Sequence, residues 1–86
     1  MIAKTVKISN KLGLHARPSA KVVQTATKFK SEITLEKEGI EVNSKSIMGV
    51  MMLAAEMGAE ITITATGEDE EEAVKAMCEV VTSKFD

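Results

Sequence analysis

The sequence predicts an α+β fold, an open-faced sandwich in which four strands carry three helices on one face. Four short stretches alternate apolar and polar side chains, and three stretches between or after them space their apolar residues as helices do. Strands with a single buried face need all their helices on that face. With 86 residues and no linker or repeat, the chain is expected to form a single domain over 1–86.

The first two expected elements are a strand and a helix. Alternate apolar positions predict a strand over residues 2–8: Ile2, Val6 and Ile8. Gly13 interrupts that pattern, and Pro18 lies where the first turn of a helix tolerates a proline. The spacing beyond it predicts a helix over 16–27, whose inner stripe is Ala16, Ala20, Val23 and Thr27, flanked by Val22 and Ala26.

A hairpin and a short apolar helix should follow. Alternation on both sides of a turn at 37–39 predicts two paired strands with inward-facing Ile33, Leu35, Ile40 and Val42. The segment 47–53 is apolar almost all round and ends before Gly58. So short a helix is stable only where it lies on other elements.

The last two expected elements are a strand and a long helix. Ile61, Ile63 and Ala65 alternate with threonines up to Gly67. Asp69 is then placed to cap a helix, with Glu72 at the capping-box position, and the inner stripe of that helix is Val74, Met77, Val81 and Phe85. The single cysteine, Cys78, lies beside this stripe and is expected to be a small core residue.

Composition narrows the kind of partner. A net charge of -2 and an aromatic content of 2% argue against nucleic acid, which proteins usually meet with a basic face and stacking rings. No apolar run is long enough to span a membrane, the N-terminal residues lack a signal-peptide pattern, and one cysteine cannot form an internal disulfide. We therefore expect a cytoplasmic monomer that meets partner proteins, not nucleic acid or a membrane.

The only histidine stands directly before the first expected helix. A phosphoryl group on His15 would meet the unpaired N–H groups of Ala16 and Arg17 and the positive end of the helix dipole. The Arg17 guanidinium can pair with phosphate oxygens, and Pro18 fixes the first turn. Imidazole is a good nucleophile near neutral pH and leaves phosphorus readily. The alternative is an ordinary surface histidine, which the neighbouring Gly13, Arg17 and Pro18 make the weaker interpretation.

The surroundings of His15 predict a carrier that is not itself an enzyme. One histidine and one cysteine that lie far apart in the sequence do not form a set of zinc ligands. The sequence also has no Ser-His-Asp arrangement of a catalytic triad and no glycine-rich phosphate-binding loop. No cofactor or metal is expected. A chain this small would borrow the rest of its chemistry from a partner.

A second cluster lies at 43–49, where Ser46 falls at the start of the short helix. Capping alone would explain a serine there. A phosphate on Ser46 would also be accepted by the helix start, and its charge would repel an acidic partner surface. The residues themselves leave capping and regulation equally open.

The apolar side chains beside these clusters predict a docking surface. A helix this apolar on a fold with a single sheet rarely buries every side, so part of it should be exposed near His15. The alternative is that all of these side chains are core. We favour docking, with the surface formed by Leu14, Ile47, Met48 and Met51.

Two motifs resemble those of the HPr family of histidine-containing phosphocarriers, and the resemblance covers essentially the whole chain. Gly13-Leu14-His15-Ala16-Arg17-Pro18 is similar to the family's active-site signature, and Ser44-Lys45-Ser46-Ile47-Met48-Gly49-Val50-Met51 to its regulatory-serine signature. The resemblance implies an antiparallel sheet in the strand order 1-4-2-3. Ser19 stands where many members have alanine.

The same resemblance implies a function. Enzyme I would phosphorylate His15 at Nδ1 with a group from phosphoenolpyruvate, Arg17 would assist, and enzyme IIA units would take the group on for sugar uptake. In some members an HPr kinase/phosphorylase modifies the residue matching Ser46, and that form binds a catabolite-control repressor. The alternatives are a nitrogen-type phosphocarrier and a purely regulatory paralogue; the presence of His15 argues against the second.

Overall fold

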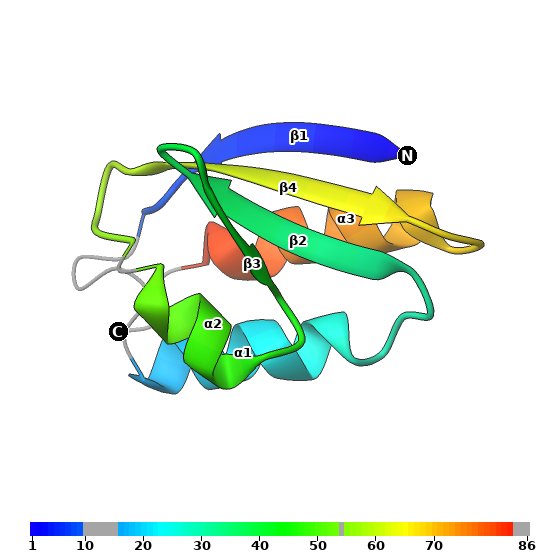
Figure 1. Cartoon of the computed structure of the whole chain (residues 1–86), viewed down its shortest axis with the longest axis horizontal. Coiled ribbons are helices and arrows are strands. Elements are labelled where there is room, and N and C mark those ends of the chain that lie inside the picture. Colours follow the sequence, from blue (N-terminus) through cyan, green and yellow to red (C-terminus); the bar gives the residue numbers. More distant parts are fainter. Residues whose placement is uncertain (10–15, 54, 84–86) are drawn as a thin grey trace.

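The computed structural model describes residues 1–9, 16–53 and 55–83. The described residues form the α+β arrangement that the sequence predicts (Figure 1). In chain order the elements are β1 (Ile2–Lys7), α1 (Ala16–Ala26), β2 (Glu32–Lys37), β3 (Ile40–Asn43), α2 (Ile47–Met52), β4 (Glu60–Thr66) and α3 (Glu70–Val81).

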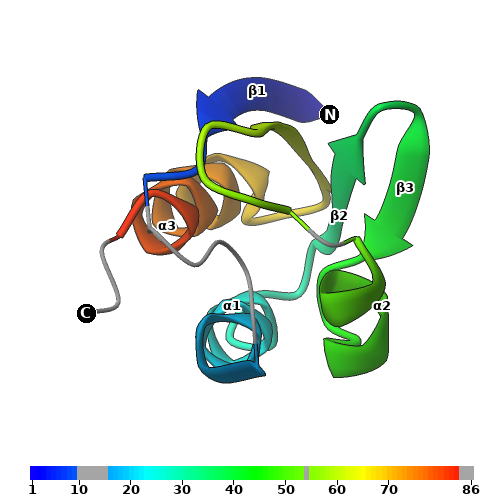
Figure 2. The ribbon, with the colours of Figure 1, turned by 90° about the vertical axis from the view of Figure 1, so that its left-hand side faces the viewer.

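The strands form one antiparallel sheet in the order β1-β4-β2-β3. This is the order that the family resemblance implies. Figure 2 shows α1, α2 and α3 together on one side of the sheet. The opposite face carries polar side chains, among them Thr5 of β1 and Thr62 of β4, whose hydroxyl groups are 2.9 Å apart and hydrogen-bonded. The open-faced sandwich is therefore confirmed.

The core lies between the sheet and the helices. The sheet contributes alternate side chains that are at most 1% exposed, as period-two patterning predicts: Ile33, Leu35, Ile61 and Ile63. The helices contribute Val22, Ala26, Val50, Ala73, Met77 and Val81. Burial of these apolar side chains is the main contribution to folding.

The hairpin between β2 and β3 is tighter than the sequence predicts. Lys37 pairs with Ile40, so the loop has two residues, Glu38 and Gly39, where we expected three. Both have positive φ, 51° and 83°, as a type I′ turn requires, and glycine adopts such a φ without strain. The expected inward position of Ile40 is wrong, because this residue is 60% exposed at the end of the hairpin.

The buried stripe of α1 differs from the expected one. The buried side chains are Ser19, Val22 and Ala26, whereas Ala20 and Val23 are half-buried and Thr27 lies exposed beyond the helix. Ser19 was not part of the predicted stripe. The serine side chain is nevertheless small enough to face the core, so the stripe is rotated by about one position.

The short helix α2 ends at Met52 with Leu53 as its C-cap, within one residue of the predicted 47–53. The expected core position of Cys78 is borne out only in part. Cys78 is half-buried and not part of the fully buried core. Phe85, the last member of the expected α3 stripe, lies outside the described residues.

Asp69 occupies the N-cap position of α3 as predicted, but its side chain makes no capping hydrogen bond. Its carboxylate oxygens accept hydrogen bonds from the backbone N–H groups of Lys30 and Ser31, both at 2.9 Å, and from the Ser31 hydroxyl. The carboxylate is therefore used to join the turn before β2 to the turn before α3. Glu70 accepts a hydrogen bond from the backbone N–H of Gly67 at 3.1 Å, which is not the capping-box bond expected of Glu72.

Gly67 is required where these two turns meet. Its φ is +153°, and an added Cβ would lie 2.7 Å from Ser31 Cα, closer than side chains tolerate. The backbone of one turn therefore lies directly against Ser31 of the other. Asp69 and Gly67 hold this end of the sheet together.

We expect Asp69→Asn to lower the thermal midpoint at neutral pH, with little effect at pH 2. The Ser31 hydroxyl, followed by the Lys30 N–H, lowers the pKa of Asp69 from 3.8 to about 2. Because the folded-state pKa is the lower one, the carboxylate stabilises the protein fully above about pH 4, and this contribution is lost as the pH falls toward 2. In thermal melts, the midpoints of Asp69→Asn and the unmodified protein should differ at pH 7 and converge as the pH falls to 2.

The matched control for this prediction is Glu68→Gln. Glu68 makes only an exposed ion pair with Lys30, at 3.9 Å, and such pairs contribute little to stability. The thermal midpoint of Glu68→Gln should equal that of the unmodified protein across the whole pH range. An Asp69→Asn midpoint that matches this control at pH 7 would contradict the bridging role.

Candidate functional site

The expected phosphorylation site lies at the start of α1. His15 and Leu14 lie outside the described residues, and so do the side chains of Ala16 and Arg17. The backbone of α1 begins at Ala16, the residue directly after His15. A helix start has N–H groups without intrahelical partners and the positive end of the dipole, both of which favour a bound anion. Pro18 is fully buried in the first turn, where its missing N–H costs nothing.

The end of α2 lies at the same end of the molecule as this helix start. Figure 1 places the last turn of α2 and the first turn of α1 there. The two helices are also in contact. Side chains from the outer surface of α2 are therefore in position to meet any protein that approaches the start of α1.

Ser46 is the N-cap of α2, as predicted. Its φ and ψ are extended, and its hydroxyl oxygen accepts a hydrogen bond from Gly49 N–H at 3.2 Å. The residue as a whole is half-buried. A charge at this position would lie at the positive end of α2.

The chain before Ser46 is held firmly by side chains. The Ser44 hydroxyl donates to the Ile33 carbonyl oxygen at 2.8 Å, and the Lys45 ammonium donates to the Phe29 carbonyl oxygen at 2.8 Å. Asn43 accepts the Lys45 N–H at 2.9 Å through its side chain. These bonds connect the start of α2 to the sheet and to the end of α1, so Ser46 occupies a fixed position.

The outer side of α2 is an exposed apolar surface. Ile47 and Met51 are 43% and 44% exposed, and Met48 is 69% exposed, so the expected exposure of this helix is confirmed. Val50 is fully buried and attaches the helix to the core. Met52, which the sequence analysis left out of the docking surface, is 75% exposed. The signal was present, because Met52 follows Met48 by four residues and shares its side of the helix.

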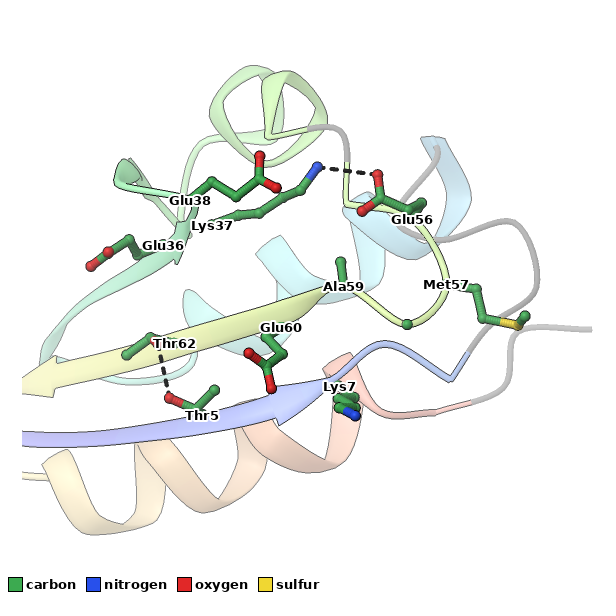
Figure 3. A pocket seen from close by; sticks show the side chains of 11 residues that line it. Thr5, Lys7, Glu36, Lys37, Glu38, Glu56, Met57, Ala59, Glu60 and Thr62 are labelled. Atoms are coloured by element: carbon green, nitrogen blue, oxygen red, sulfur yellow. Dashed lines mark hydrogen bonds and ion pairs between the residues drawn. The ribbon is translucent and has the colours of Figure 1, made fainter.

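A hollow of about 770 Å³ lies away from this surface, between the end of β1 and the β2–β3 turn (Figure 3). Its walls carry carboxylates and two lysines, and Lys37 Nζ lies 3.2 Å from Glu56 Oε2. That ion pair joins β2 to the loop that leads into β4. Within the described ranges no group of histidine, cysteine, aspartate or glutamate residues could hold a metal ion.

The fold and this site define a class of protein. The described residues offer a helix start for an anion and an exposed apolar helix for a partner, features that suit a small group carrier. Along the described stretches, no helix is long and apolar enough to cross a membrane.

Comparisons with known proteins identify the family. The sequence model of a family described as "PTS HPr component phosphorylation site" matches residues 2–83. The phosphocarrier protein HPr of Xylella fastidiosa is 51% identical over 85 residues, which cover 99% of this chain and 96% of the relative. The HPr-like protein Crh of Bacillus subtilis is 48% identical over 81 residues, which cover 94% of this chain and 95% of the length of Crh.

A solved structure agrees with these matches. The crystal structure of HPr-C-His from Thermoanaerobacter tengcongensis has a TM-score of 0.93 and 52% identity, covering 99% of this chain and 96% of the other. The chain belongs to the HPr family. It is thus a cytoplasmic phosphocarrier of the bacterial phosphotransferase system (PTS), a carrier and not a catalyst.

Proposed function

We propose that this chain accepts a phosphoryl group on His15 from enzyme I and passes it to enzyme IIA units for sugar uptake. The single observation that carries the proposal is the position of His15, the only histidine of the chain, directly before the start of α1 at Ala16. The N–H groups of Ala16 and Arg17 and the Arg17 guanidinium then bind the phosphate oxygens, and Pro18 fixes the turn. The chain works as one domain and as a monomer.

Both partners meet the same surface in this proposal. Leu14, Ile47, Met48 and Met51 form the docking surface, because the exposed side of α2 lies beside the start of α1. Methionine side chains are flexible and polarisable, so one surface can fit enzyme I and several enzyme IIA units in turn.

The direct test is phosphorylation in a purified system. With enzyme I and phosphoenolpyruvate, the intact mass should increase by one phosphoryl group, which acid removes, as expected for phosphohistidine. Added enzyme IIA should then take the group from the carrier. A chain that stays unmodified, or that gains an acid-stable phosphate, would contradict the relay and favour a purely regulatory role.

We further propose that Ser46 is a regulatory phosphorylation site, modified by an HPr kinase/phosphorylase and read by a catabolite-control repressor. Support comes from its position, which is only half-buried, and from the helix start behind it, which can accept an added negative charge. The charge would lie beside the docking surface on α2 and would repel an acidic enzyme I surface.

We expect Ser46→Asp to hold or raise the thermal midpoint while slowing phosphorylation by enzyme I. The carboxylate can cap α2 and interacts favourably with its dipole, so the fold should not lose stability. Melting curves and initial rates with enzyme I measure the two effects separately.

The control is Ser46→Ala, which removes the cap without adding charge. It should lose about 1 kcal/mol of stability and keep its rate with enzyme I. If Ser46→Asp unfolds the protein, or reacts with enzyme I as fast as the unmodified chain, Ser46 is a cap alone.

A further inference from the structure

Two methionines form the most exposed row of α2. Met48 and Met52 are four residues apart, so their side chains project from the same side of the helix. They are more exposed than the neighbouring row formed by Ile47 and Met51. The row runs toward the last turn of α2, which lies at the end of the molecule where α1 begins (Figure 1).

An exposed thioether is open to oxidation by peroxide. A sulfur lone pair attacks one oxygen of hydrogen peroxide, an S–O bond forms and the O–O bond breaks. The hydroxide that leaves takes up the proton from the transferred oxygen and becomes water. Sulfur loses two electrons that the peroxide gains, and the product is a polar sulfoxide in place of an apolar side chain.

A buried methionine of the same chain serves as an internal control for this oxidation. Met77 of α3 is fully buried, whereas Met48 and Met52 are largely exposed. Peroxide should therefore modify the α2 row long before it reaches the core. Burial also raises the pKa of the Cys78 thiol, which keeps it protonated and slow to react with peroxide.

We propose that Met48 and Met52 are a reversible oxidation site through which peroxide weakens docking of enzyme I. The inference rests on the proposed function, because a polar row on α2 matters only if partners dock there. Each sulfoxide brings a strongly hydrated S=O group into a surface that must lose water on binding. Methionine sulfoxide reductases with a dithiol reductant reverse the change: the dithiol becomes a disulfide, and the sulfoxide oxygen leaves as water.

The test combines mass spectrometry with kinetics on the full chain. After treatment with hydrogen peroxide, peptide masses should show one added oxygen on Met48 and on Met52, and none on Met77. The KM of enzyme I for the oxidised carrier should rise about tenfold, with kcat nearly unchanged, because docking and not chemistry is affected. Incubation with both sulfoxide reductases and dithiothreitol should restore the original KM.

Leucine variants separate this row from the other exposed methionines. In the double variant M48L/M52L, peroxide should raise the KM much less than in the unmodified chain, each compared with its own untreated value, although Met51 of the docking surface can still react. M57L is the matched control, since Met57 is 56% exposed on the loop before β4 (Figure 3), and it should remain as sensitive as the unmodified chain.

The possible results show separately whether the oxidation inference fails or whether the proposed function on which it rests fails. An unchanged KM after oxidation of Met48 and Met52, or a double variant whose KM rises as much as that of the unmodified chain, would overturn the inference alone. An untreated chain that accepts no phosphoryl group from enzyme I would overturn the proposed function and the regulatory role with it.

Discussion

Replacement of His15 by alanine is expected to abolish phosphorylation by enzyme I and phosphoenolpyruvate. The chain has no second histidine that could take over the group, so the loss should be complete. Intact-mass measurement before and after acid treatment gives the result directly. Stability should be close to that of the unmodified chain, which thermal melting checks.

His15→Gln serves as the matched control for size and polarity. It keeps a polar side chain of similar length but has no imidazole nucleophile, so it should be as inactive as His15→Ala. An acid-labile phosphate on either variant would remove His15 from the relay.

Replacement of Arg17 by alanine is expected to slow phosphoryl transfer about 10- to 100-fold. A hydrogen bond from a guanidinium to a phosphate oxygen is among the stronger ones, and its loss at the transition state has an effect of that size. The free energy of unfolding should change little, because a single charged side chain at a helix start contributes weakly to stability. Rapid-quench rates with enzyme I, beside urea unfolding, measure both quantities.

Arg17→Lys tests whether charge alone is sufficient. Lysine keeps the positive charge but cannot pair with two phosphate oxygens at once, so its rate should fall between those of Arg17→Ala and the unmodified chain. Equal rates for all three proteins would place Arg17 outside the site.

The sequence predicted the elements well because their patterns are local. Alternation defined the four strands within about one residue, and helical spacing defined α1 and α3. The N-cap position of Ser46 was also predicted, since a serine before an apolar helix is a local signal. The strand order required a family resemblance, because pairing joins residues far apart in the chain.

Features that depend on distant contacts were missed. Asp69 has the sequence position of a cap, yet its carboxylate bonds to Lys30 and Ser31, which no local pattern connects with it. Ser19 is buried although serine is polar, because the packing of α1 decides which side faces the core. The exposure of Met52 was predictable from its spacing to Met48, so that omission was avoidable.

The junction formed by Gly67, Asp69 and Ser31 lies at the opposite end of the sheet from the starts of β3 and β4 and from the first turn of α1 (Figure 1). Anchorage of the fold and the proposed docking surface are thus separated along the long direction of the molecule. Effects of substitutions so far apart usually add. If partners dock as proposed, that end can diverge to suit new enzymes while the far end maintains stability, and a protein engineer can strengthen the far end without altering which partners bind.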